Sequence, residues 1–266
     1  MSGKNPARSI NLDQIKTDLN ISKEDQEKPA FLKLKNDVFY LMLNNNLNTF
    51  NRDFLRLINK LLDEVENHDG PTALVTMGFN NKYFSTGMDL KFIAGLNAIS
   101  YIDVQLFVIE LMHLYGRLLG FPVPTISVLN GHAIAGGLML AFAHEVVLMR
   151  DDFGQLALTE IELGMPLPPG MNSVIQQRTG NTNEYRQLVL TAKRFTPKQA
   201  FTAGWLDGIF EPEQLFSKAV EMAEFRSKFG ENKTNYKKLK LEMNKIAYSD
   251  CFNKQHANGF VGEPKL

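Results

Sequence analysis

The sequence has a single cysteine, Cys251, in 266 residues, so no disulfide can form within the chain. It also lacks an excess of charge, because 29 lysine and arginine residues balance 29 aspartate and glutamate residues. A neutral chain generates no long-range field that would hold it on nucleic acid or on an anionic membrane. We therefore expect neither nucleic acid nor a membrane as a partner.

Long apolar runs are missing as well. The longest, residues 133–149, is interrupted by His144 and Glu145 and falls short of the roughly 20 apolar residues that cross a bilayer. The N-terminal residues 1–5 are not followed by the apolar run that a secretory signal needs. With 44% hydrophobic and 22% charged residues, the composition is that of a soluble globular protein.

Several motifs of known chemistry are also absent. The sequence has no G-x-G-x-x-G dinucleotide fingerprint, no P-loop lysine after a glycine pair and no Gly-x-Ser-x-Gly elbow of an α/β-hydrolase. His132 has no cysteine or second histidine at the spacing of metal ligands, so a structural role is expected for it. We predict no metal site.

The patterns that are present alternate between strand and helix from residue 30 onward, which is typical of an α/β domain with crossover connections. The apolar run at residues 38–43 predicts a strand buried on both faces. Residues 54–65 carry one apolar helical stripe, preceded by Asn51 as a candidate N-cap. We divide the chain into a flexible polar extension (1–29), a core domain (30–210) and a C-terminal helical region with a terminal tail (211–266).

Two glycine-bearing segments each lead from a predicted strand towards a predicted helix. They read Phe-Ser-Thr-Gly-Met-Asp-Leu at residues 84–90 and Asn-Gly-His-Ala-Ile-Ala-Gly-Gly at residues 130–137. Backbone N–H groups at a helix start are unpaired and lie at the positive end of the helix dipole. Two such groups that converge would stabilise an oxyanion, although each glycine taken singly is more often explained by turn geometry.

An acidic segment follows the apolar residues 156–158. Glu160 lies at the end of this predicted strand, where apolar surroundings would raise the pKa of its carboxyl by disfavouring the charged form. Such a group is a candidate general base, although an isolated glutamate more often caps a turn or pairs with a surface cation. Glu162 competes for the role, because residues two apart in an extended chain share a face.

The order of these segments resembles the crotonase (enoyl-CoA hydratase/isomerase) superfamily over about residues 35–210. Residues 84–90 are similar to its F-[SC]-x-G-x-D-[LI] loop, residues 124–137 to its P-x-I-A-x-[IVL]-x-G-x-[AC]-x-G-G-G segment, and residues 160–164 to its E-[IV]-x-[IL]-G stretch. The resemblance implies an α/β fold, a ClpP-like spiral of ββα turns with a C-terminal helical region. It also implies assembly as a homotrimer or hexamer.

The resemblance assigns roles to residues of these segments. The backbone N–H groups of Met88 and Gly136 would form an oxyanion hole for an acyl-CoA thioester, and Glu160 would act opposite them. The residues that would bind the thioester are Ser85, Thr86, Gly87, Met88, Asp89, Leu90, Gly136 and Gly137. Coenzyme A is then part of the substrate, and we expect no separate cofactor.

A cluster of lysines near the C-terminus has two possible interpretations. The cluster comprises Lys233, Lys237, Lys238, Lys240 and Lys245. A solvated helix face is the default interpretation, and contact with the phosphates of coenzyme A is the alternative.

Differences from the superfamily patterns favour one reaction. Enoyl-CoA hydratases carry a second glutamate where this chain has Met139, and dienoyl-CoA isomerases carry aspartates where it has Met139 and Pro168. Glu160 is then the single carboxylate opposite the oxyanion hole, and this pattern is typical of Δ3-Δ2-enoyl-CoA isomerases of fatty acid β-oxidation. The chain is most similar to their plant peroxisomal branch. Two alternatives stay open: another acyl-CoA reaction, such as thioester hydrolysis or hydration, and a non-catalytic acyl-CoA-binding protein.

The chain ends in Pro264, Lys265 and Leu266, close to the Ser-Lys-Leu tripeptide that the peroxisomal import receptor reads. Pro264 departs from the small residue that is commonest at the first of these positions, but the plant peroxisomal isomerases share a Pro-Lys-Leu terminus. We expect the import receptor as a partner and the peroxisomal matrix as the location.

Overall fold

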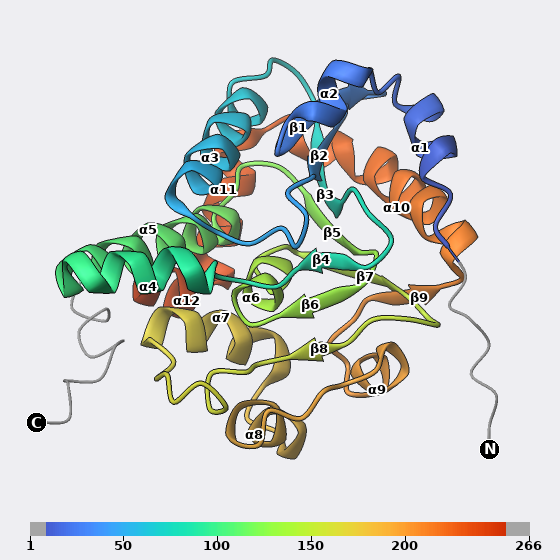
Figure 1. Ribbon diagram of the computed structural model, residues 1–266. Helices are drawn as coiled ribbons and strands as arrows, with labels where there is room; N and C mark the ends of the chain where they lie inside the picture. The colour runs from blue at the N-terminus through green and yellow to red at the C-terminus, as the bar shows by residue number, and fades with distance from the viewer. Residues whose placement is uncertain (1–8, 254–266) are drawn as a thin grey trace, which may run out of the picture.

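Two sheets form the centre of the structure, a computed structural model that describes residues 9–253 (Figure 1). The larger sheet has the order β1-β2-β3-β5-β7-β9, and the smaller has the order β4-β6-β8. β1 pairs antiparallel with β2, and every other pairing of named strands is parallel. The strands are β1 (Ala30–Lys35), β2 (Val38–Leu43), β3 (Ala73–Gly78), β4 (Tyr83–Ser85), β5 (Thr125–Leu129), β6 (His132–Ile134), β7 (Val146–Arg150), β8 (Leu156–Ala157) and β9 (Gly208–Phe210).

From β3 to β8, successive strands alternate between the two sheets, which makes this part of the fold a spiral. The pairs β3–β4, β5–β6 and β7–β8 each place one strand in the large sheet and the next in the small sheet, and helices then lead to the next pair. The helices of these turns are α4 (Leu90–Ile99), α5 (Tyr101–Leu119), α6 (Gly136–Phe142), α7 (Pro169–Thr179), α8 (Asn183–Leu190) and α9 (Pro197–Thr202). The predicted α/β spiral of ββα turns is confirmed.

The large sheet is covered on both faces, as the continuous apolar run of β2 predicts. Val38, Tyr40 and Met42 belong to one core cluster, together with residues of α1 (Leu12–Asp18) and α10 (Pro212–Ser227). Phe39, Leu41 and Leu43 belong to the other cluster, together with residues of α3 (Arg52–Glu66), α5 and α6. Asn51 caps α3 as predicted, because its side chain accepts the N–H of Phe54 at 2.9 Å.

The N-terminal segment is folded over residues 9–29, which corrects the prediction of a flexible extension. It forms α1 (Leu12–Asp18) and α2 (Lys23–Glu27). Ile10, Ile15 and Leu19 are buried in the cluster that lines one face of the large sheet. Three apolar side chains among many polar ones form a sparse stripe, which is why the sequence pattern did not indicate a packed helix. Burial of the three side chains together nevertheless holds the short helix against the sheet. Residues 1–8 lie outside the described residues.

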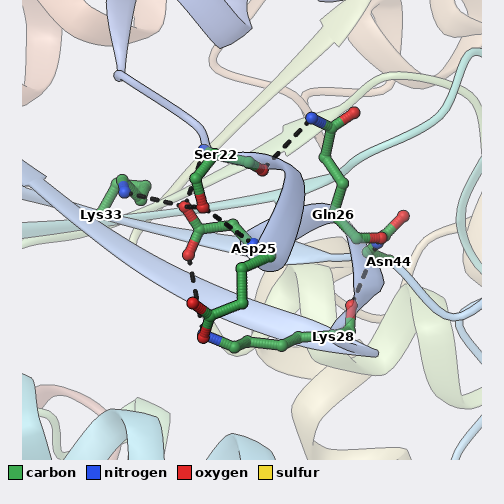
Figure 2. Close-up of polar contacts among 7 residues, drawn as sticks. Ser22, Asp25, Gln26, Lys28, Lys33 and Asn44 are labelled. Atoms are coloured by element: carbon green, nitrogen blue, oxygen red, sulfur yellow. Dashed lines mark hydrogen bonds and ion pairs between the residues drawn. The ribbon is translucent and has the colours of Figure 1, made fainter.

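Polar contacts hold α2 against the sheet (Figure 2). Ser22 and Asp25 form a reciprocal capping box at the start of α2. The carboxylate of Asp25 also pairs with Lys33 of β1 at 3.0 Å, and these contacts hold the pKa of Asp25 at about 2 against the opposing effect of burial. The side chain of Asn44 donates to the carbonyls of Gln26 and Lys28 at 2.8 and 3.0 Å.

Between β9 and residue 253 the chain is helical, as predicted. It comprises α10, a short 3₁₀ turn (Lys228–Gly230), α11 (Lys233–Met243) and α12 (Lys245–Phe252). A Cβ atom on Gly116 of α5 would lie 2.5 Å from the ring of Phe252, so α12 packs closely on α5. Within residues 9–253, no helix combines the length and apolar character needed to cross a membrane. The terminal tripeptide Pro264–Leu266 lies outside the described residues.

Candidate active site

A cavity of about 570 Å³ opens beside the carboxyl ends of β2, β4, β6 and β8. The segments that follow parallel strands supply its walls, as is usual for ligand sites in α/β folds. The lining residues are Asn45, Asn46, Leu47, Thr49, Asn51, Thr86, Met88, Asp89, Leu90, Lys91, Ala135, Thr159, Glu160, Leu163 and Met165.

The backbone at Met88 presents a free N–H group. A parallel bridge joins Phe50 to Met88: the N–H of Phe50 donates to Gly87 at 2.8 Å, and the N–H of Asp89 donates to Phe50 at 2.9 Å. In such a bridge the central residue directs its own N–H and C=O away from the partner. Within the described part of the chain, the N–H of Met88 has no acceptor.

The second donor lies at the start of α6. Ala135 adopts φ of 51°, a left-handed conformation that typically costs an alanine of the order of 1–3 kcal/mol and is often found at functional sites. Gly136 is the first residue of α6, so its N–H is one of the unpaired donors of a helix start. Among the described residues it has no hydrogen-bond acceptor.

Two glycines let these donor segments touch. Gly87 has φ of 85°, and a Cβ atom there would lie 2.8 Å from the backbone nitrogen of Gly136. A Cβ atom on Gly136 would lie 3.3 Å from the Cα of Gly87. Side chains at either position would push the segments apart, so the glycines let the backbones at residues 87–88 and 135–136 lie in close contact. Met88 and Ala135 of these segments line the cavity.

Ser85 and Gly137, predicted to bind the thioester, lie behind this contact and do not line the cavity. The hydroxyl of Ser85 is fully buried, donates to Asn48 at 2.7 Å and accepts the N–H of Gly87 at 3.2 Å. A Cβ atom on Gly137 would lie 2.2 Å from the carbonyl oxygen of Ser85. Both residues hold the donor segments together. Of the other predicted residues, Thr86, Met88, Asp89 and Leu90 line the cavity, whereas Gly87 and Gly136 do not.

Glu160 lines the cavity with a largely buried carboxyl group. One of its oxygens, Oε2, is buried and makes no hydrogen bond to the described residues. Burial raises the pKa of Glu160, although hydrogen bonds from the backbone of Glu160 and Thr159 act in the opposite direction. A carboxyl group in this state can accept a proton from a molecule in the cavity.

The structure separates Glu160 from Glu162. The chain turns here instead of continuing β8: the N–H of Leu163 donates to Thr159 at 3.2 Å, and that of Met165 donates to Glu160 at 2.9 Å. Glu162 therefore points away from the cavity and forms a two-pronged ion pair with Arg194, with both N–O distances at 3.1 Å.

Asp89 is the other carboxylate that lines the cavity, and it is occupied as a helix cap. Its side chain accepts the N–H groups of Lys91 and Phe92 at the start of α4, at 3.0 and 3.1 Å. Met139 is fully buried in the core and does not reach the cavity. Among the described lining residues, Glu160 is therefore the carboxylate that is available for proton transfer.

The C-terminal lysines do not line this cavity. Lys240 is buried and pairs with Glu145 at 2.7 Å, and the ammonium of Lys233 donates to the carbonyl of Glu66 near the end of α3 at 3.0 Å. Neither lysine is therefore part of a solvated face. The lysine at this cavity is Lys91 of α4, which the sequence reasoning did not select.

His132 has a structural environment, as predicted. Its ring packs against Phe153 at 4.9 Å between centroids, and burial lowers its pKa. Within residues 9–253, no group of three or more His, Cys, Asp or Glu side chains is arranged to hold a metal ion.

The loop after β2 is the largest part of the site that sequence reasoning missed. Asn46 and Asn48 have φ of 43° and 53°, a conformation that asparagine tolerates better than most residues. Asn48 also donates to the carbonyl of Phe84 at 2.8 Å, which fixes this loop to β4. The run of asparagines directly after a buried strand was the available signal.

Comparison with known proteins identifies the fold and the family. The profile of the family described as enoyl-CoA hydratase/isomerase matches residues 33–258. A solved structure of a probable enoyl-CoA hydratase from Mycobacterium tuberculosis has a TM-score of 0.74 at 25% identity, covering 87% of this chain and 94% of that one.

Two curated relatives come from Arabidopsis thaliana. Enoyl-CoA delta isomerase 2, peroxisomal, is 30% identical over 179 residues, which are 66% of this chain and 75% of that protein. Enoyl-CoA delta isomerase 3 is 32% identical over 180 residues, which are 66% of this chain and 74% of that protein. The names of the similar proteins thus include both isomerases and a hydratase. With a crotonase fold and a family match over most of its length, the chain belongs to the enoyl-CoA hydratase/isomerase family of the crotonase superfamily.

Proposed function

We propose that the protein is a Δ3-Δ2-enoyl-CoA isomerase, which moves the double bond of a 3-enoyl-CoA to the 2-position. The observation that carries this proposal is that one available carboxylate, Glu160, lines the same cavity as Met88 and Ala135, next to the free N–H groups of Met88 and Gly136. The substrate brings its own coenzyme A, and the proposed reaction needs no other cofactor.

The proposed reaction begins with the thioester oxygen accepting the N–H groups of Met88 and Gly136. Glu160 removes a proton from C2, and the electrons of the C–H bond pass into a dienolate whose oxygen carries the negative charge. The two N–H groups stabilise that charge, each typically by a factor of about 10²–10³ in rate. The protonated Glu160 then returns a proton to C4, which leaves the C2–C3 double bond and a free carboxylate.

One base is sufficient because the dienolate is planar, so a single carboxyl group on one side of the plane can exchange protons with both C2 and C4. The apolar side chains of Leu90, Leu163 and Met165 line the same cavity as Glu160. They disfavour water beside the dienolate and keep the carboxyl poised as a base. A hydratase would use a second carboxylate, and the position of that group is taken by the buried Met139.

The first experiment mixes the purified protein with a trans-3-enoyl-CoA and identifies the product. Accumulation of the conjugated 2-enoyl-CoA, seen as a rise in ultraviolet absorbance, is the expected result. A 3-hydroxyacyl-CoA as the first product would instead indicate hydration, and release of free thiol would indicate thioester hydrolysis. Binding of acyl-CoA without any turnover would support a non-catalytic protein.

We also propose that the protein works in the peroxisomal matrix as a homotrimer or hexamer, with Pro264, Lys265 and Leu266 read by the import receptor. The word "peroxisomal" in the name of one relative supports this location.

A further inference from the structure

Tyr115 of α5 reaches the back of the two donor segments. Its side chain is fully buried, and its hydroxyl donates to the carbonyl oxygen of Gly136 at 2.9 Å. The two residues are 21 positions apart, so this bond ties α5 to the first residue of α6. Tyr115 does not line the cavity.

The strained backbone before Gly136 needs such ties. Ala135, with φ of 51°, is fixed at its own N–H, which donates to Ala157 of β8 at 2.8 Å. Its carbonyl accepts the N–H of Leu138 at 2.9 Å. A left-handed alanine persists only where its neighbours determine its conformation. The free N–H of Gly136 belongs to the same planar peptide group as the carbonyl of Ala135. The carbonyl of Gly136 belongs to the next peptide group, and the hydroxyl of Tyr115 anchors that group. The backbone of Gly136 is therefore anchored on both sides of its Cα.

The hydroxyl of Tyr115 also lies where the two donor segments meet. A Cβ atom on Gly136 would lie 2.8 Å from this hydroxyl and 3.3 Å from the Cα of Gly87, the residue before Met88. Burial raises the pKa of Tyr115 well above its usual range, and the nearby charge of Glu160 adds to this effect. The hydroxyl therefore stays protonated at neutral pH and can donate its hydrogen bond.

We infer that Tyr115 is a positioning residue for the oxyanion hole, because its hydroxyl holds the Gly136 backbone in the orientation that aims its N–H at the thioester oxygen. This inference deepens the proposed function and depends on it for its effect on turnover. Loss of the hydroxyl releases the Gly136–Gly137 peptide and loosens the backbone at Gly136, which misaligns its N–H and weakens an interaction that is strongest when charge develops on the oxygen.

The test compares Tyr115→Phe with Tyr185→Phe. The Tyr185 hydroxyl donates to Asn172 away from the cavity, so its removal controls for the loss of a hydrogen-bonded phenol. For Tyr115→Phe we expect kcat to fall roughly tenfold with little change in KM, as for an interaction made mainly in the transition state. Tyr185→Phe should leave both unchanged.

A second readout follows the carbonyl group directly. Hexanoyl-CoA labelled with ¹³C at the thioester carbon is bound to each protein, and its carbonyl stretch is measured by difference infrared spectroscopy. Binding to the wild-type protein should lower the stretching frequency, and Tyr115→Phe should return it part of the way to the free value. 4-Aminophenylalanine at position 115, a weaker donor than tyrosine, should give an intermediate frequency.

The outcomes separate the two claims. If the wild-type protein isomerises and folded Tyr115→Phe matches it in kcat and carbonyl frequency, the role of Tyr115 is overturned and the proposed function stands. If the wild-type protein does not isomerise but the bound carbonyl still responds to position 115, the proposed function fails and the positioning role stands. If Tyr115→Phe does not fold, 4-aminophenylalanine decides, and a frequency equal to that of the wild type overturns the inference.

Discussion

Two carboxylates line the cavity, and their hydrogen bonds give them different roles. Asp89 accepts two backbone N–H groups and is fixed as the cap of α4. Oε2 of Glu160 is buried and makes no hydrogen bond to the described residues. A carboxylate that is already satisfied is a poor proton acceptor, whereas a desolvated one gains by taking a proton. The proposed base is thus selected at the scale of single hydrogen bonds.

The pH dependence of the reaction should report the pKa of Glu160. Its carboxyl must be ionised to accept the C2 proton, so kcat should fall as pH decreases through a pKa that burial raises above 4.5.

The raised pKa of Glu160 also means that its ionised carboxyl group destabilises the folded protein at neutral pH. Glu160→Gln should therefore unfold at the same or a higher temperature than the wild type at pH 7. Rate profiles and thermal melts check both points, and a lower melting temperature would contradict the burial argument.

Gly87→Ala should impair catalysis by separating the two donors. An alanine would strain a backbone with φ of 85° and place its Cβ 2.8 Å from the nitrogen of Gly136. We expect kcat/KM to fall by about 10²-fold or more, as on loss of one oxyanion donor. Gly95→Ala is the matched control, because that position on α4 has no heavy atom within 4 Å of the added Cβ. Equal activity of the two variants would show that the close contact is not needed.

At the scale of whole elements, strands with long apolar runs could be predicted from the sequence and short elements could not. β2 has six consecutive buried residues, a pattern typical of a strand covered on both faces. β4, β6 and β8 have two or three residues each, too few to show a period. The turn after β8 decided between Glu160 and Glu162, and residue spacing carries no information about where an extended chain bends.

Helix α1 offers a direct test of whether the N-terminal segment is part of the folded core. Ile15 is 2% exposed and packs with the sheet face also covered by α10. Ile15→Ala should lower the free energy of unfolding by about 2–5 kcal/mol, the usual cost of an Ile→Ala change in a core. Ile99→Ala, at a position that is 81% exposed, should have little effect. Denaturant unfolding measures both, and equal stability of the two variants would show that residues 9–19 do not contribute to the core.

At the scale of the whole molecule, three segments far apart in sequence meet at one cavity because the spiral stacks the carboxyl ends of its strands. The motifs at residues 84–90, 130–137 and 160–164 indicated this meeting through their resemblance to a superfamily. The asparagine loop at residues 45–51 was not predicted as part of the site, since its residues join the cavity through contacts between segments far apart in sequence, such as the pairing of Phe50 with Met88 and the hydrogen bond from Asn48 to Phe84.

The proposed peroxisomal location is also a property at the scale of the whole molecule. A fusion with a fluorescent protein at the N-terminus should enter peroxisomes, and deletion of residues 264–266 should leave it in the cytosol. Replacing the tripeptide with Ser-Lys-Leu is the control and should restore import. Peroxisomal import of the deleted form would contradict the proposed role of this terminus.

The central claim is that Glu160 is the base of a double-bond isomerisation. The most direct measurement follows the ultraviolet absorbance of 2-enoyl-CoA formed from a trans-3-enoyl-CoA by the wild type, Glu160→Gln and Glu162→Gln. The two variants change the same functional group two positions apart, but only Glu160 lines the cavity, and Glu162 pairs with Arg194. We predict that Glu162→Gln keeps the wild-type rate, whereas Glu160→Gln folds, binds acyl-CoA and loses most of its turnover. A Glu160→Gln variant with the wild-type rate would contradict the account.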